Sequence, residues 1–242
     1  MIFRMGIVMG ALGAVCVAGA TDAESAAPSS TRNWTNLVAF GDSITRGYAL
    51  RPGEGWVELL PALIKKEFTN KTVAVFNAGV NGNTSAEGVA RLEADVLAHM
   101  PGLVLVEFGG NDAAHDARAV SVDAFERNLL ATAEKVRASG GDVVLVTFPP
   151  VINEWHSTRS DSYYKKWGGI DQCVEQYRQR TREVAKRLGC PLLDLDALLR
   201  KRMAEKDREL YFNRDGVHLT PEANKQIASE VVKFLKEIGA AK

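Results

Sequence analysis

Residues 37–45 read LVAFGDSIT, in which four apolar side chains in succession are followed by a glycine, an aspartate and a serine. A short run without a polar position is typical of a strand that is covered on both faces, as in a parallel sheet. In an open parallel sheet, ligands bind at the carboxyl ends of the strands, where this polar turn lies. The stretch therefore predicts a parallel sheet and marks one of its edges as the place for a functional site.

Four further apolar runs repeat this pattern at intervals too long for β-hairpins. Between them lie segments with a 3.6-residue hydrophobic period and recognisable caps, which predict helices. Strand-helix-strand units with right-handed crossovers give a mainly parallel sheet with helices on both faces, an α/β/α sandwich in one domain. The runs are residues 73–76, 103–108, 143–148 and 191–195, and helices are expected at 56–68, 84–98, 122–139, 170–188 and 220–238.

The balanced charge of the chain limits its partners. The 242 residues carry 30 Lys plus Arg and 30 Asp plus Glu, so the formal net charge is zero. This balance argues against nucleic acid as the main partner. The sequence contains no Cys-x-x-Cys and no His-Glu-x-x-His. The common local zinc signatures are therefore missing, although a metal site assembled from distant residues stays open.

Residues 1–20, MIFRMGIVMGALGAVCVAGA, are predicted to be a secretory signal peptide, because one early arginine precedes an apolar run and a small-residue triplet. An uncleaved membrane anchor is disfavoured, since the run is short and no basic cluster follows it. Lipoprotein processing at Cys16 is a minor alternative, because a valine precedes the cysteine. Residues 21–33 are expected to be a flexible leader before a domain at 34–242. We expect a secreted or periplasmic protein without a stable membrane span after processing.

Cys173 and Cys190 would remain after such processing, and an oxidising compartment permits disulfides. The predicted helix at 170–188 lies between them. At a rise of ~1.5 Å per residue it separates their Cα atoms by roughly 25 Å, well beyond the ~7 Å limit for a disulfide. We therefore expect two free, buried thiols.

Residues 149–169 fit neither the helix nor the strand period. Loops of this length are usually functional or disordered, and a high aromatic content argues against disorder. Two interpretations stay open, a packed surface loop that covers a helix end and a lid that faces substrate. The rings in question belong to Trp155, His156, Tyr163, Tyr164 and Trp167.

The turns after the first three strands should meet at one edge of the sheet and carry Ser43, Gly79 and Asn111. A serine nucleophile needs a base, and Asp215 and His218 have the spacing of a base and the carboxylate that orients it. Acyl transfer also needs donors for an oxyanion, which the Gly79 N–H and the Asn111 amide can supply. Each residue alone is better explained by turn formation or capping. Their combination favours catalysis.

Together these residues resemble the four blocks of the SGNH (GDSL-type) hydrolases, in the order of that family. The resemblance covers almost all of the chain after residue 34. It implies a flavodoxin-like sandwich with a five-stranded parallel sheet in the order 2-1-3-4-5. The blocks are Gly41-Asp42-Ser43, Gly79, Gly109-x-Asn111-Asp112 and Asp215-x-x-His218.

By this resemblance Ser43 is the nucleophile, His218 the general base and later acid, and Asp215 the residue that orients His218. The oxyanion hole would comprise the N–H groups of Ser43 and Gly79 and the side chain of Asn111. The expected reaction is hydrolysis of a small-molecule carboxylic ester through an acyl-enzyme, which needs neither a metal nor an organic cofactor.

The remaining positions of the motif are two carboxylates beside the predicted site and the two residues that follow Ser43. Asp42 and Asp112 are expected to brace the turns, because charges beside a site more often support it than react. Ile44 stands where the family has leucine, which leaves the nucleophile untouched. Thr45 stands where Gly-x-Ser-x-Gly would need glycine, so the nucleophile elbow of the α/β-hydrolases is not predicted.

The choice of ester stays open at this stage. Residues 39–112 look similar to bacterial periplasmic thioesterase and lysophospholipase members, which act on acyl thioesters and lysophospholipids. The aromatic side chains of residues 149–169 could instead stack on sugar rings, and secreted members of the family include carbohydrate O-acetylesterases. A catalytically idle glycan-binding module is an alternative of another class, against which the complete set of blocks argues. A nucleotide-binding protein is disfavoured because no phosphate-binding glycine motif follows a strand. The oligomeric state is not predicted.

Overall fold

The computed structural model describes residues 2, 34–68 and 72–239 and confirms the five-stranded parallel sheet. The strand order is β2-β1-β3-β4-β5, as the family resemblance implies. The carboxyl ends of β1 and β2 are in register, and Gly41 on β1 also pairs with Glu107 on β3. The strands are β1 (Asn36–Gly41), β2 (Ala74–Gly79), β3 (Leu103–Glu107), β4 (Asp142–Val146) and β5 (Leu192–Leu193).

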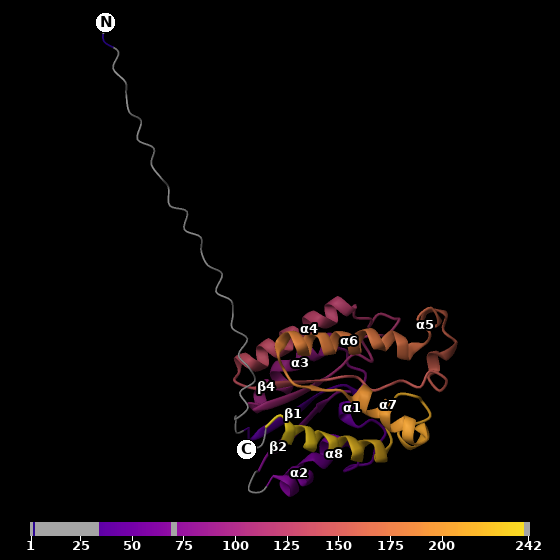
Figure 1. The fold of residues 1–242 in the computed structure, drawn as a ribbon, viewed down its shortest axis with the longest axis horizontal. Helices are drawn as coiled ribbons and strands as arrows, with labels where there is room; N and C mark the ends of the chain where they lie inside the picture. The colour runs from indigo at the N-terminus through magenta and orange to yellow at the C-terminus, as the bar shows by residue number, and fades with distance from the viewer. Residues whose placement is uncertain (1, 3–33, 69–71, 240–242) are drawn as a thin grey trace.

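Helices cover both faces of the sheet, with α3, α4 and α6 on one side and α2 and α8 on the other (Figure 1). This arrangement confirms the predicted α/β/α sandwich. The α-helices are α1 (Ser43–Arg46), α2 (Trp56–Glu67), α3 (Ser85–Asp95), α4 (Val122–Ala138), α5 (Ser162–Lys165), α6 (Ile170–Leu188), α7 (Leu195–Glu205) and α8 (Pro221–Glu237), and the 3₁₀ helices are η1 (Leu97–His99), η2 (Ser157–Ser160) and η3 (Arg208–Leu210).

The apolar runs of the sequence form the buried core of the sheet. Every residue of β3 is buried, while β2, at the edge, has only its last two residues buried. A strand between two helical layers is covered on both faces, which explains why residues 103–106 of β3 are all apolar and show no alternation. On the helical side, Phe125 of α4 and Ile227 of α8 are fully buried. One core thus lies on each face of the sheet.

The capping residues predicted from the sequence are found at the starts of helices α3 and α8. The capping box at Thr84 is present, and Thr220 caps α8 with Pro221 in the first turn. α3 ends at Asp95 and is followed by η1, so the helix predicted at 84–98 is regular only over its first part. Such breaks near helix ends are common and do not change the packing of the element.

The last strand and the helix after it differ from the prediction. The run at 191–195 forms only the two residues of β5, because the Asp194 side chain accepts the N–H of Ala197 and caps α7. A capping aspartate ends the extended backbone, so α7 begins where the apolar run suggested strand. The segment 149–169 also gains structure that the sequence analysis did not predict, namely η2 and α5.

Cys173 and Cys190 are both free and buried, as predicted. Among the described residues, no helix has both the length and the apolar character needed to cross a bilayer. The predictions for the signal peptide at 1–20, Cys16 and the leader at 21–33 concern a part of the chain that, Ile2 apart, lies outside the described residues.

Candidate active site

The three residues predicted to form a catalytic triad lie in one hydrogen-bonded chain. The Nε2 atom of His218 is 3.0 Å from the Oγ atom of Ser43. On the other side of the ring, Nδ1 of His218 is 2.7 Å from Oδ2 of Asp215. Ser43 begins α1 directly after β1, whereas Asp215 and His218 lie in the turn before α8. The parallel sheet and α8 thus bring together residues that are far apart in the sequence.

The Asp215 carboxylate builds its own turn while it holds the imidazole. Its Oδ1 accepts the N–H groups of Val217 and His218, each at 2.9 Å. Burial works against ionisation of this carboxyl, but these two N–H groups and the His218 ring lower its pKa below the usual value. A carboxylate fixed beside Nδ1 favours the tautomer that keeps Nε2 free to accept a proton from Ser43.

Ser43 is presented by the short helix α1, which Asp42 caps. Oδ1 of Asp42 accepts the N–H of Ile44 at 2.9 Å. The indole of Trp56, on α2, donates to the Ile44 carbonyl at 3.1 Å. The N–H of Ser43 is one of the groups that a helix start leaves without an intrahelical acceptor. The turn is therefore fixed from both sides while the Ser43 amide is left for another partner.

Asn111 lies beside this turn through its side-chain amide. Its Nδ2 atom donates to Oδ2 of Asp42 and to the carbonyl of Asn83, each at 3.0 Å. Asn111 lines the same cavity as Ser43 and His218. The structure thus brings Asn111 together with the triad, with both amide hydrogens already held by protein oxygens.

Asp112 braces a neighbouring helix, as expected. Its carboxylate accepts the N–H of Ser85 at the start of α3, at 3.0 Å from Oδ1 and 3.1 Å from Oδ2. Burial raises the pKa of Asp112 to about 6, although these hydrogen bonds favour the charged form. Asp112 therefore holds the start of α3 next to Asn111 and has no contact with the triad that would make it a reacting group.

Gly79, predicted as an oxyanion donor, has its N–H engaged in a hydrogen bond within β2. Its N–H donates to Oδ1 of Asn77 at 3.0 Å, so the donor is already engaged. A Cβ at this position would be 2.3 Å from the backbone nitrogen of Arg46. The glycine is therefore explained by the close approach of β2 to α1. Gly82, in the following turn, has a φ of +78° and open space beside it, and its neighbour Asn83 contacts Asn111.

Arg91 is a site-supporting residue that the sequence analysis missed. Its guanidinium donates to the carbonyl oxygens of Gly41 and Ala78, each at 2.8 Å, and to Oδ1 of Asn83 at 2.7 Å. One side chain on α3 thus joins the ends of β1 and β2 to the turn beside Asn111. A single arginine on a helix carries no sequence signal for this role, because the carbonyls meet only in the folded sheet.

A cavity of about 400 Å³ opens beside Ser43 and His218. The segment 149–169 forms one of its walls and is docked on the catalytic turn, since the N–H of Ile152 donates to the Gly216 carbonyl at 2.8 Å. The segment is therefore a packed loop that also faces the cavity. The apolar residues that line the cavity are Phe148, Val151, Tyr164, Ile170, Val174 and Val217, and the polar ones include His115, Asp116, Arg118, His156, Thr158 and Asp161.

His156 places a further imidazole in this cavity, in addition to those of His115 and His218. Its Nδ1 accepts the N–H of Thr158 at 3.2 Å and contacts the Thr158 hydroxyl at 2.7 Å. Burial lowers the pKa of His156, and the nearby His218 acts in the same direction while Asp215 opposes it. The ring is thus held neutral, with Nε2–H as its remaining donor. From the sequence, His156 is expected only as one of the aromatic side chains of residues 149–169, without a role of its own.

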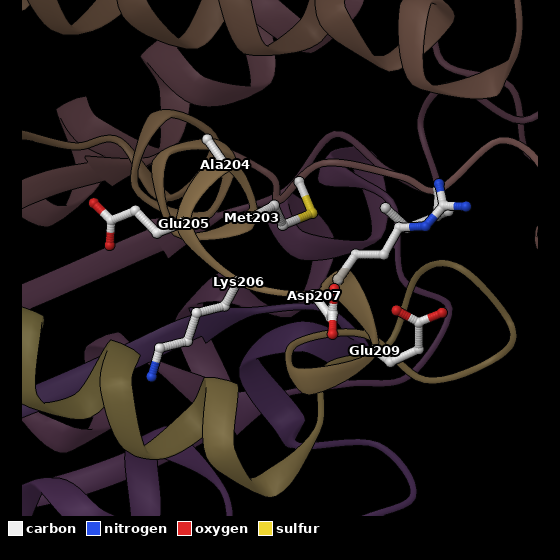
Figure 2. Close-up of a pocket in the computed structure, with 8 residues that line it drawn as sticks. Met203, Ala204, Glu205, Lys206, Asp207 and Glu209 are labelled. Atoms are coloured by element: carbon white, nitrogen blue, oxygen red, sulfur yellow. The ribbon is translucent and has the colours of Figure 1, made fainter.

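A second, larger cavity of about 580 Å³ lies away from the triad, at the end of α7 (Figure 2). It is lined by residues 203–209 together with Ile152, and charged side chains of both signs spread from this segment. None of the predicted site residues lines it. Size alone therefore does not select the candidate site, which is chosen by the hydrogen-bonded chain of Ser43, His218 and Asp215.

With this geometry in place, comparison with known proteins identifies the family. The sequence pattern of the GDSL-like Lipase/Acylhydrolase family matches residues 39–226, a range that contains the Ser43, Asn111 and His218 blocks. The chain belongs to this family. Family membership makes it a GDSL-type hydrolase that acts on ester bonds.

The relatives of this GDSL-type hydrolase cover its chain to different extents. It is 33% identical over 179 residues to the uncharacterized lipoprotein YqeF of Bacillus subtilis, which is 67% of this chain and 71% of that protein. It is 36% identical over 110 residues to thioesterase 1/protease 1/lysophospholipase L1 of Escherichia coli strain K12, covering 46% of this chain and 49% of the relative. That match thus spans about half the length of the relative.

The fold of this hydrolase is also that of solved members of the family. The crystal structure of the lipase/acylhydrolase from Enterococcus faecalis superimposes with a TM-score of 0.67 at 28% identity. The superposition covers 84% of this chain and 95% of that protein. The sheet, its flanking helices and the edge that carries the triad therefore belong to an architecture shared within the family.

Proposed function

We propose that the protein hydrolyses carboxylic esters through an acyl-enzyme on Ser43. The observation that carries this proposal is the chain from Ser43 Oγ through His218 to Asp215, with links of 3.0 and 2.7 Å. As Oγ bonds to the ester carbonyl carbon, its proton passes to Nε2 of His218, which then gives it to the leaving alcohol or thiol. Water activated by His218 attacks the acyl-enzyme in the same way and releases the acid and Ser43.

The oxyanion in this scheme is bound by the Ser43 N–H and the Asn111 amide. Because Asn111 faces the cavity, an oxyanion can compete with the Asn83 carbonyl for one of its hydrogens. The N–H of Gly79 already donates to Oδ1 of Asn77, and Gly79 is packed against the backbone of α1. We therefore propose Gly82, beside Asn83, as the source of a third backbone donor in place of Gly79.

The size of the cavity favours acyl groups longer than acetyl. An acetyl group needs roughly the space of two water molecules, on the order of 60 Å³ from the liquid volume of water. The cavity beside Ser43 holds about 400 Å³, and Phe148, Val151 and Val174 give it an apolar wall. We propose that this wall receives the acyl chain, which supports thioester or lysophospholipid hydrolysis over carbohydrate O-deacetylation.

Hydrolysis of p-nitrophenyl esters from acetate to palmitate tests this proposal, with Ser43→Ala as the control. We expect activity to rise beyond acetate and to be lost in the Ser43→Ala variant. A profile that peaks at acetate and has collapsed at butyrate would favour the carbohydrate O-acetylesterase alternative. Absence of any Ser43-dependent hydrolysis would favour the idle glycan-binding module.

We also propose that the protein is exported, either secreted or periplasmic. The sequence of residues 1–20 supports this proposal, and a relative is named as a lipoprotein. N-terminal sequencing and intact mass of the protein recovered from the cell envelope or medium test it. Cleavage near residue 20 is expected, whereas a lipid on Cys16 would show the lipoprotein route and an intact N-terminus would contradict processing.

A further inference from the structure

A second carboxyl lies directly behind the nucleophile turn and takes no part in the proposed chemistry. Glu107 ends β3, pairs in register with Gly41, and is 1% exposed. A Cβ on Gly41 would lie 2.8 Å from Oε2 of Glu107 and 2.2 Å from the Thr45 hydroxyl. The glycine before Asp42 thus leaves the space into which the Glu107 carboxyl fits.

One oxygen of the Glu107 carboxyl accepts a side-chain hydroxyl, and the other oxygen has no partner. The Thr45 hydroxyl donates to Oε2 at 2.9 Å. Oε1 is buried and has no hydrogen-bond partner among the described residues. A carboxylate oxygen buried without a donor is costly, whereas the O–H of a protonated carboxyl needs an acceptor. The acceptor at hand is the side chain of Asp42, the ionisable group that acts most strongly on Glu107.

The two carboxyls cannot both be charged at low cost. Asp42 and Glu107 are fully buried, and neither forms an ion pair with a basic side chain of the described residues. Two carboxyls that share a buried site keep one proton between them. Burial and the Asp42 charge raise the pKa of Glu107 well above its usual range, while burial raises that of Asp42 to about 7.

The hydrogen bonds show which carboxyl keeps the proton. Asp42 accepts two N–H donors, from Ile44 and from the Asn111 amide, and both favour its anion. Glu107 accepts the Thr45 hydroxyl, which serves either form, and the backbone N–H of Asp42, whose effect on its pKa is smaller than those of burial and of the Asp42 charge. The proton therefore belongs on Oε1 of Glu107.

We propose that Glu107 is a positioning residue that remains a neutral carboxylic acid and donates its proton to the Asp42 carboxylate. Through Asp42 it acts on two groups of the proposed reaction. Oδ1 of Asp42 caps the helix that begins with Ser43, and Oδ2 holds the Asn111 amide. The proton donated by Glu107 keeps the Asp42 carboxylate charged and oriented toward the N–H of Ile44 and the Asn111 amide. The proposal rests on the ester hydrolysis proposed above and adds no step to it.

A pair of substitutions at one position separates the donor from the bulk of the side chain. In Glu107→Gln, the amide can still donate to Asp42 and accept from Thr45, so we expect kcat within about threefold of the wild type. In Glu107→Met the size is kept and the donor is lost. We expect kcat to fall by about 10- to 100-fold with KM within about threefold, because an interaction that aligns the oxyanion donors acts in the transition state.

Infrared spectroscopy reads the proton without any turnover. At pH 8, where Asp42 and Asp112 are mostly ionised, the wild type should show the carbonyl band of one neutral carboxylic acid. The band should shift in protein labelled with ¹³C-glutamate and be missing in Glu107→Gln. This measurement also decides the case if the Glu107→Met variant fails to fold.

Each contrary result is distinct. A full-rate Glu107→Met variant, or a Glu107→Gln variant as slow as Glu107→Met, would overturn the positioning role, and absence of the band would overturn the protonation state. Failure of ester hydrolysis in the wild type would instead contradict the proposed function, and the infrared band would still report on the Glu107 proton.

Discussion

The ring of Tyr48 lies over the imidazole of His218, with centroids 4.3 Å apart and ring planes inclined by 39°. Tyr48 follows α1, which also carries Ser43, and its side chain is 45% exposed. It therefore covers the His218 ring from the solvent side. In the proposed reaction the imidazole becomes a cation, and a facing aromatic ring stabilises that charge.

Replacing Tyr48 should consequently slow turnover by a modest factor. A cation-π contact at an exposed site contributes about 0.5–1 kcal/mol, so Tyr48→Ala should lower kcat roughly two- to fivefold. Tyr48→Phe keeps the ring and serves as the control, with kcat close to that of the wild type. If Tyr48→Phe loses as much as Tyr48→Ala in steady-state kinetics, the hydroxyl rather than the ring face would be responsible.

Asp215→Asn should reduce activity strongly with little effect on the fold. The asparagine Oδ1 can still accept the N–H groups of Val217 and His218, so the turn is kept. Its NH2 would face Nδ1 of His218 and favour the tautomer with hydrogen on Nε2, which cannot accept the Ser43 proton. We expect kcat to fall by about 10²- to 10⁴-fold, yet less than in Ser43→Ala. Unchanged kcat, with a melting temperature like that of the wild type, would show that Asp215 only builds the turn.

Alanine at the two glycines of the second turn should separate packing from backbone conformation. At Gly79 a Cβ would meet the Arg46 backbone at 2.3 Å, so Gly79→Ala should impair folding itself. At Gly82 the space is open but φ is +78°, so Gly82→Ala should cost only about 1 kcal/mol. Denaturant unfolding measures both. Equal stability of the two variants would contradict the close packing of β2 against α1.

The buried carboxyl of Asp112 predicts a specific dependence of stability on pH. Burial raises its pKa from 3.8 to about 6, so between these values the folded state binds more protons than the unfolded state. Its contribution to stability is therefore greatest below pH 4 and is lost as the pH rises to about 6. A shift of this size corresponds to roughly 3 kcal/mol.

Comparison with Asp112→Asn isolates this contribution, because asparagine does not titrate. The unfolding free energy of the wild type should fall relative to that of Asp112→Asn from pH 4 to 6 and then run parallel to it. Urea titrations at half-unit pH intervals measure the difference. A difference that stays constant over this range, or that grows in favour of the wild type, would show that the Asp112 pKa is not raised.

Local patterns in the sequence are sufficient to predict the sheet and to select Ser43, Asp215 and His218, which the structure places in one hydrogen-bonded chain. Each strand of the sheet contains a short apolar run. Ser43 follows the end of β1 and His218 precedes α8, so the order of strands and helices fixes where these two residues lie. The family resemblance also implied the strand order that the structure shows. Helix α7 is not predicted from the sequence, because Asp194 lies within an apolar run that is typical of a strand. Its role as the helix cap is visible only in its hydrogen bond with the N–H of Ala197.

Residues that act across strands could not be found in this way. Glu107 lies in an apolar run, and only the register of β3 against β1 places it behind Asp42. Arg91 supports the strand ends through carbonyl oxygens that a sequence does not identify. The family resemblance implies that Gly79 is an oxyanion donor, and a backbone N–H without a side chain in the way fits that role as well as a turn. The contact with Arg46 that explains it is visible only in the structure.

The central claim is that Ser43, activated by His218, forms a covalent bond with the acyl group. Intact-mass analysis after reaction with a fluorophosphonate, followed by peptide mapping, tests it directly because the probe bonds only to an activated nucleophile. We expect a single adduct on the peptide that contains Ser43, no adduct in Ser43→Ala, and strongly slowed labelling in His218→Ala. An unlabelled wild-type protein, or an adduct on another residue, would contradict it.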